Sequence, residues 1–169
     1  MFIVFNCRNV KMKKINNPYK EMDGYQCFGC APQNTNGLQM NFAEDGEYVV
    51  SEWKPKDYFQ GYYNVLHGGI QATLMDEIAS WLVQVKLKTA GVTSTMNVRY
   101  KKTVPINKGN IKLRARLTGK RRNLADIHVE LFGPDDELCA ESDFVYYTFP
   151  HDVAVKQLHY PDYEEFFKD

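Results

Sequence analysis

The spacing of apolar residues predicts one long helix in the middle of the chain. From Gly68 to about Lys88, apolar residues recur every three or four positions, as they do on one face of a helix. The stripe comprises Ile70, Leu74, Ile78, Leu82 and Val85, widened by Ala72, Met75 and Ala79. A more polar side holds Thr73, Asp76, Ser80 and Gln84. Gly91 is expected to close the helical region.

The sequence after this helix alternates between apolar and polar residues, which is typical of half-buried β-strands. Four stretches do so, at 96–100, 111–117, 125–131 and 138–146, with turn sequences at 119–123 and 133–136. Residues 38–42 and 48–53 predict an earlier hairpin across Glu44-Asp45-Gly46. A helix and an antiparallel meander with one apolar face must pack together, because neither can bury that face alone. The pattern therefore predicts an α+β fold with a sheet wrapped around one helix.

The length of 169 residues fits a single domain with its own core. Residues 1–26 lack clear periodicity and are interpreted as an N-terminal arm. Residues 27–150 form the predicted domain, and 27–36 within it are rich in turn formers. Residues 151–169 are an acidic and aromatic tail with an expected short helix after Pro161.

The sequence favours a cytoplasmic protein that does not cross a membrane. No window approaches the apolar length of a membrane span. The first five residues are apolar but too short for a signal peptide, and basic residues follow them instead of preceding them. Met12 offers an alternative start. Four cysteines without a signal peptide suggest reduced thiols.

Two of these cysteines, Cys27 and Cys30, have the spacing of half a zinc site or of a redox pair. The sequence contains no second Cys pair or His pair with metal-ligand spacing. A turn with buried thiols is therefore the favoured interpretation, and no metal is expected.

Charge is unevenly distributed along a chain whose formal net charge is zero. Residues 99–122 carry ten Lys or Arg residues and no acid, so the remainder is net acidic. Such a run is most often a solvated face of a sheet, and it also suits an anionic partner. Nucleic acid is disfavoured, because no aromatic-basic recognition motif or helix-turn-helix accompanies the run.

The start of the predicted helix carries the candidate chemistry. Gly68 and Gly69 place backbone N–H groups at the positive end of a helix, where they can stabilise a developing negative charge. Asp76 lies inside the helix, where Asp is neither a good helix former nor a cap. An N–H donor and a carboxylate together suit attack on an acyl group.

The distance between these two groups predicts a dimer. Gly68 and Asp76 are eight residues apart, which corresponds to about 12 Å along one helix axis. One reacting carbonyl cannot touch both groups of the same helix. If both act on it, a second copy of the chain must supply one of them across an interface.

The motif from His67-Gly68-Gly69 to Asp76-Glu77 resembles that of PaaI-type acyl-CoA thioesterases of the hotdog-fold superfamily. Their mark is His-Gly-Gly followed, after a short apolar run, by Asp or Asp-Glu. The stretch from Cys27 to Leu38 is similar to the entry segment of one branch, and 92–100 followed by Pro105 match the strand after the central helix. The resemblance runs from about Cys27 to Phe149. It implies a hotdog-fold hydrolase of acyl-CoA, without a metal or redox cofactor, that forms homodimers or homotetramers.

The resemblance also implies roles for individual residues. Gly68 N–H stabilises the oxyanion, and Asp76 is the nucleophile or general base, with Glu77 as second candidate. The Thr93 hydroxyl positions water, and His67 is more a structural residue of the helix entry than a base. Several members carry Asn six residues before the His, where this chain has Gly61. The expected substrate-binding residues are Gly61, Tyr62, Asn64, Gly69 and Arg99.

Several alternatives stay open. The basic run would bind coenzyme A phosphates if the resemblance holds. Aromatic residues could line an aryl-accepting or medium-chain pocket or fill the core; they are Tyr58, Phe59, Tyr62, Tyr63 and Trp81. Coenzyme A and acyl carrier protein are both possible carriers. The alternative function is a non-catalytic acyl-CoA or small-ligand binding protein, which Gly61 favours. A hotdog dehydratase is disfavoured, because its usual local pattern of a His and an acid is not found.

Overall fold

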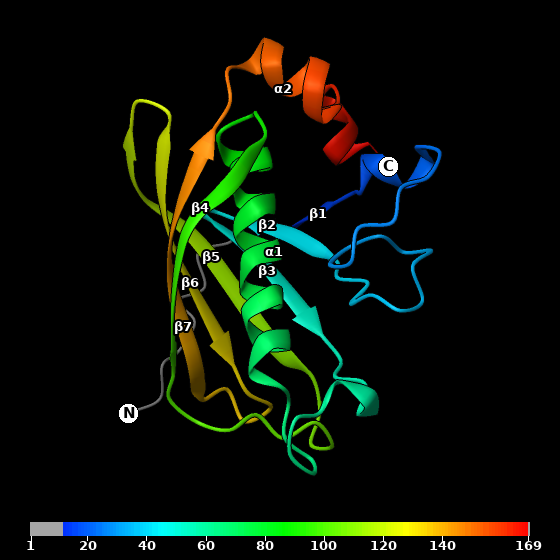
Figure 1. The fold of residues 1–169 in the computed structure, drawn as a ribbon, viewed down its shortest axis with the longest axis vertical. Coiled ribbons are helices and arrows are strands. Elements are labelled where there is room, and N and C mark those ends of the chain that lie inside the picture. Colours follow the sequence, from blue (N-terminus) through cyan, green and yellow to red (C-terminus); the bar gives the residue numbers. More distant parts are fainter. Residues whose placement is uncertain (1–11, 169) are drawn as a thin grey trace.

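One long helix, α1 (Gly68–Lys86), lies against a seven-stranded antiparallel sheet in the computed structural model, which describes residues 12–168 (Figure 1). The predicted stripe faces the sheet: Leu74, Ile78 and Leu82 are fully buried, whereas Ile70 at the helix start is partly exposed. Neither surface could exclude water without the other. The α+β architecture predicted from periodicity is confirmed.

The sheet has the strand order β1-β2-β3-β5-β6-β7-β4. Its strands are β1 (Lys13–Ile15), β2 (Phe42–Asp45), β3 (Tyr48–Trp53), β4 (Gly91–Tyr100), β5 (Ile111–Arg121), β6 (Leu124–Phe132) and β7 (Leu138–Thr148). A second helix, α2 (His151–Leu158), follows the last strand. Three short 3-10 helices are η1 (Pro18–Glu21), η2 (Asp57–Phe59) and η3 (Tyr163–Phe167).

The place of β4 corrects the predicted meander. Strands β5, β6 and β7 are neighbours in chain order, but β4 pairs with β7 at the far edge of the sheet. Helix α1 carries the chain from β3 to that edge. Met96 and Tyr100 of β4 lie opposite the buried Phe144 and Ala140 of β7, yet they stay 42% and 52% exposed. The alternation of apolar and polar residues predicted correctly which face of the sheet Met96 and Tyr100 lie on. It did not predict that they would stay exposed because β4 is an edge strand.

The predicted hairpin is confirmed, with shifted ends. Strands β2 and β3 pair antiparallel, and β2 begins at Phe42 instead of Leu38. Leu38 is buried all the same, and its carbonyl accepts a hydrogen bond of 2.6 Å from the Trp53 indole. The turn lies at Gly46, whose positive φ of 59° suits glycine.

Two other predicted boundaries were wrong. Helix α1 ends before Leu87, and Gly91 is the first residue of β4 instead of the end of the helical region. A Cβ on Gly91 would lie 2.8 Å from the Tyr147 carbonyl oxygen, so this glycine permits close strand packing. The turn predicted at 119–123 is confirmed only at residues 122–123, because strand β5 extends to Arg121. The turn at 133–136 is confirmed between β6 and β7.

Both ends of the described chain pack onto the domain. Residues 12–26, interpreted as part of an arm, contain β1 and η1, and β1 adds to the sheet beside β2. The helix expected after Pro161 is confirmed as η3, whereas α2 was not predicted. Phe166 of η3 is fully buried against Trp81, and its carbonyl accepts from the Asn16 N–H at 2.8 Å. The predictions for residues 1–11, including the apolar start and the first cysteine, lie outside the described residues, and the alternative start at Met12 stays a prediction.

Among residues 12–168, no helix has both the length and the apolar character needed to cross a membrane.

Candidate active site

His67 fixes the entry of α1. It is the N-cap residue, and its Nδ1 accepts a hydrogen bond of 2.9 Å from the Gly69 N–H. Because Nδ1 accepts, the neutral ring carries its proton on Nε2. Gly69 is thereby engaged within the chain, and Gly68 is the other glycine that presents a first-turn N–H here. His67 thus caps the helix through its side chain, and its role in any reaction stays a prediction.

A pocket of about 600 Å³ opens beside the start of α1. Four predicted site residues share its wall, namely Gly61, Tyr62, His67 and Gly68. The opposite wall comes from the end of β4 and the loop after it, with Tyr100, Lys101 and Lys102. The Tyr100 hydroxyl donates to the Gly68 carbonyl at 2.7 Å, which joins the two walls. The pocket therefore combines a helix N-terminus with two lysines, and both features attract anions.

Asp76 is held by two hydroxyl groups. The Thr93 hydroxyl donates to Asp76 Oδ1 at 2.6 Å, and the Tyr146 hydroxyl donates to the same oxygen at 2.7 Å. Tyr146 also donates to the Asp76 carbonyl at 2.9 Å. Both hydroxyls bond to Oδ1, and neither engages Oδ2. The contact between Thr93 and Asp76 joins two residues that the sequence proposed separately.

Tyr146 is a residue of the candidate site that the sequence analysis missed. It lies on β7 and is buried, and it was assigned only to the apolar face of that strand. Burial, and then the neighbouring Asp76 charge, raise the pKa of Tyr146 well above its ordinary value, so its hydroxyl remains a donor. The available signal was its chemistry, because a buried tyrosine hydroxyl usually needs a partner.

The structure does not bring Asp76 and Gly68 together within one chain. Both belong to α1, Gly68 lines the pocket at the helix start, and Asp76 faces Thr93 and Tyr146 two turns further on. This separation is what the spacing of the two residues predicted.

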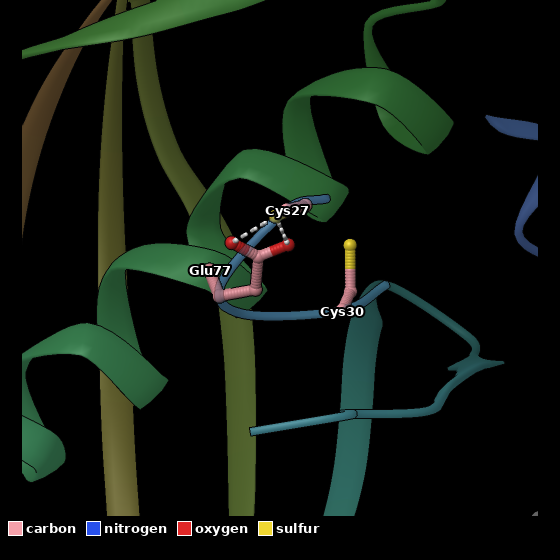
Figure 2. A group of neighbouring side chains, drawn as sticks. All are labelled: Cys27, Cys30 and Glu77. Atoms are coloured by element: carbon pink, nitrogen blue, oxygen red, sulfur yellow. Dashed lines mark hydrogen bonds between the residues drawn. The ribbon is translucent and has the colours of Figure 1, made fainter. Parts of the chain in front are cut away.

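Glu77 points toward the loop that holds Cys27 (Figure 2). Its two carboxylate oxygens lie 3.6 and 3.7 Å from the Cys27 sulfur, and its Oε1 accepts from the Trp81 indole at 3.1 Å. Burial, and then the charge of Cys27, raise the pKa of Glu77 to about 7. The two candidate carboxylates therefore belong to two different sites.

The other expected substrate-binding residues are dispersed. Asn64 lies in a second hollow of about 530 Å³ beside Lys102 and Lys108. Arg99 bonds to Glu141 and Asp143 at 3.2 and 3.1 Å on β7, away from the first pocket. Among the aromatic candidates, Tyr58, Tyr62 and Tyr63 are exposed, whereas Phe59 and Trp81 belong to the core.

Gly61, an expected substrate-binding residue, packs against His67. A Cβ on Gly61 would lie 3.2 Å from His67 Cδ2, a close contact that the ring would have to relieve. The Gly61 N–H donates to the Val65 carbonyl at 2.9 Å and closes the turn before the helix. The absence of a side chain at Gly61 therefore leaves room for the His67 ring in its observed position.

Acidic residues neutralise much of the basic run. Lys101 and Arg99 pair with Glu141, and Lys102 pairs with Glu137. Further pairs join Lys112 to Asp136, Arg114 to Glu130 and Arg121 to Asp126. This favours a solvated sheet face for most of the run, with Lys101 and Lys102 as the members that reach the pocket.

Gln71 is a second residue that the sequence analysis missed. Its side chain is 4% exposed at the pocket wall, and its Nε2 donates to the Leu66 carbonyl at 3.1 Å. Its Oε1 is buried without a hydrogen-bond partner in the described part of the chain. A polar residue one turn into the helix, among apolar neighbours, was the signal in the sequence.

Comparison with known proteins agrees with this architecture. Residues 63–140 match the family model of the thioesterase superfamily. This segment contains the start of α1, Asp76, Thr93 and the whole of β4. It therefore carries the sequence pattern of that superfamily. The comparison with curated proteins gave no match.

Solved structures share the fold. A thioesterase superfamily protein aligns with a TM-score of 0.63 and 18% identity over 69% of this chain, which spans 57% of that protein. A thioesterase from Haemophilus influenzae aligns with a TM-score of 0.62 and 19% identity, over 68% of this chain and 84% of its own. A Streptococcus mutans protein bound to acetyl CoA aligns with a TM-score of 0.62 and 18% identity, over 78% of this chain and 98% of its own. The predicted hotdog fold is confirmed.

Proposed function

We propose that this protein is a thioester hydrolase that acts on acyl-CoA and resembles the PaaI-type enzymes most. The observation that carries the proposal is the Asp76 carboxylate, bonded through one oxygen to Thr93 and Tyr146, on the helix whose start presents Gly68 to a pocket. The match of residues 63–140 to the thioesterase superfamily supports it. So does the neighbour with bound acetyl CoA.

The proposed reaction needs no residues beyond these. Asp76 takes a proton from water, and the water oxygen bonds to the thioester carbonyl carbon. The Gly68 N–H donates to the oxyanion that forms. The C–S bond then breaks, and the thiolate leaves and is protonated. In a second route Asp76 itself attacks, and water hydrolyses the resulting anhydride. One turnover in ¹⁸O-labelled water separates the two routes, because initial hydrolysis of the anhydride at the Asp76 carbonyl would label the enzyme.

A homodimer built through β4 would complete this site. Strand β4 is an edge strand with exposed Val92, Met96 and Tyr100, and an exposed apolar edge invites pairing with another strand. Thr93 near its start contacts Asp76, and Tyr100 at its end contacts Gly68. Two β4 strands paired antiparallel about a two-fold axis place the start of one beside the end of the other. Asp76 of one copy then approaches the Gly68 pocket of its mate.

The test is release of free thiol from short, medium, long and aryl acyl-CoA thioesters by the wild type and by Asp76→Asn. Release by the wild type that Asp76→Asn abolishes, with the dimer intact, supports the proposal, and the panel identifies the acyl class. Equal release by Asp76→Asn contradicts the role of Asp76. Acyl carrier protein thioesters in the same panel distinguish the two carriers.

A second candidate is an acyl-CoA binding protein without turnover. It is favoured by Gly61, which has no side chain to orient water or the thioester at the pocket wall. Calorimetry would distinguish it: acyl-CoA would bind with equal affinity to the wild type and Asp76→Asn, and neither would release thiol.

A further inference from the structure

Three potential metal ligands from two separate segments meet beside the middle of α1 (Figure 2). Cys27 and Cys30 come from the loop before β2, and Glu77 comes from the helix. The two sulfurs and a carboxylate oxygen all lie within 4.8 Å of one another. The sequence favoured a turn with buried thiols, because it contains no second Cys pair or His pair with metal-ligand spacing. Glu77 lies fifty positions from Cys27, and it was not identified as a third ligand.

The distances suit a tetrahedral ion. Zinc binds thiolate sulfur at about 2.3 Å and carboxylate oxygen at about 2.0 Å, so adjacent sulfur and oxygen ligands lie about 3.5 Å apart. Cys27 Sγ lies 3.6 and 3.7 Å from the two oxygens of Glu77. We propose that Cys27, Cys30 and Glu77 bind one zinc ion, with one coordination position not filled by these three side chains.

Charge supports a cation at this position. Glu77 is a largely buried carboxylate, and within residues 12–168 no Lys, Arg or His forms an ion pair with it. A buried carboxylate beside two thiols is unfavourable unless a proton or a cation compensates it, and zinc bound by the two sulfurs would supply that cation. Zinc binding would form two Zn–S bonds and one Zn–O bond and release the thiol protons to solvent.

The loop is shaped to approach the helix closely. A Cβ on Gly29 would lie 2.3 Å from Glu77 Cδ, so a side chain at this position would displace the Glu77 carboxylate from the cysteines. Two hydrogen bonds fix the loop against the segment before β2: Leu38 N–H to Phe28 O at 2.7 Å, and Met40 N–H to Gly29 O at 2.9 Å. The three ligands are therefore brought together before any ion binds.

Neighbouring side chains orient the ligands. The Trp81 indole donates to Glu77 Oε1 at 3.1 Å, and the Tyr25 hydroxyl lies 3.0 Å from Cys30 Sγ. Such outer contacts hold metal ligands in place. Two thiolates and one carboxylate favour zinc over magnesium or calcium, which prefer oxygen ligands alone. This cluster is separate from Asp76 and from the Gly68 pocket, so zinc binding here does not depend on the proposed hydrolase activity.

The first test uses the wild type alone. The purified full-length chain, reduced and stripped of metal, is titrated with Co²⁺ and then with Zn²⁺. We expect a sulfur-to-cobalt charge-transfer band that saturates at about one ion per chain and disappears when zinc displaces cobalt. Absence of this band overturns the proposal. The proposal is also overturned if the protein is purified with a Cys27–Cys30 disulfide and still binds no zinc once that disulfide has been reduced.

The second test assigns the ligands. Cys27→Ser and Cys30→Ser should each lose the charge-transfer intensity and most of the bound zinc, and Glu77→Gln should keep a weaker band with at least tenfold lower zinc affinity. Cys139→Ser is the matched control, because Cys139 is also a buried free cysteine but lies on β7. Wild-type zinc content in Cys27→Ser would overturn the proposal, and circular dichroism of each variant checks that it folds.

Discussion

The Tyr146 hydroxyl donates a hydrogen bond of 2.7 Å to the Asp76 carboxylate, across seventy positions of the chain. This contact ties the last strand of the sheet to the middle of α1 and fixes the carboxylate beside the edge strand β4. It also explains why the buried face of β7 carries a tyrosine.

We expect Tyr146→Phe to lower kcat of the proposed hydrolysis by roughly tenfold to a hundredfold, because a hydrogen bond to a charged group is worth about 1.5–3 kcal/mol. The ring would still fill the core. The measurement is steady-state thiol release together with the melting temperature. Tyr147→Phe on the exposed face of the same strand is the control. An unchanged kcat in Tyr146→Phe would show that this hydroxyl does not orient the reacting carboxylate.

The second donor to Asp76 is tested by a pair of substitutions at Thr93. Thr93→Val removes the hydroxyl at constant shape, and we expect kcat to fall by about tenfold, whereas Thr93→Ser should retain most activity. Thr93 is exposed in the monomer, so neither change should lower the melting temperature by much. If Thr93→Val and Thr93→Ser lowered kcat equally, Thr93 would act through packing of the strand and not through its hydrogen bond to Asp76.

The sequence predicted α1 and strands β5 to β7 correctly, because their apolar positions follow a period that one core enforces. It placed β4 wrongly, since alternation identifies the face of a strand but not its neighbours. Leu38 to Asn41 were predicted as strand, yet the chain is strand only from Phe42. Hydrophobic contacts bury Leu38 without any ladder of hydrogen bonds.

The residues of the candidate site also fall into those that local sequence predicts and those that depend on distant segments. Asp76, Gly68 and His67 follow from local pattern, because all three depend on the helix and its N-terminus. Tyr146 and the contact of Glu77 with Cys27 depend on segments fifty to seventy positions apart. No spacing within one element could reveal these contacts, so Glu77 was grouped with its neighbour Asp76 instead of with the cysteines.

Gly61→Asn tests the packing at the helix entry. Its Cβ would lie 3.2 Å from the His67 ring, so we expect the ring to move and its bond to the Gly69 N–H to weaken. Loss of an N-cap costs about 0.5–2 kcal/mol, and urea unfolding should show a destabilisation of that size. In the His67→Ala background the same substitution should cost much less. If Gly61→Asn lowered the free energy of unfolding equally in the wild type and in His67→Ala, Gly61 would be required by the turn and not by the packing of the His67 ring.

The dimer proposal makes its prediction at Met96, in the middle of the exposed edge strand. A charge there would be buried between two paired β4 strands, so Met96→Asp should convert the dimer into a monomer in light scattering after gel filtration. Because Asp76 and Gly68 would come from different copies, thiol release should fall in proportion to the loss of dimer. Val155→Asp is the control, since Val155 is similarly exposed but lies on α2. A fully active monomer would mean that one chain supplies both groups and that the site does not span two copies.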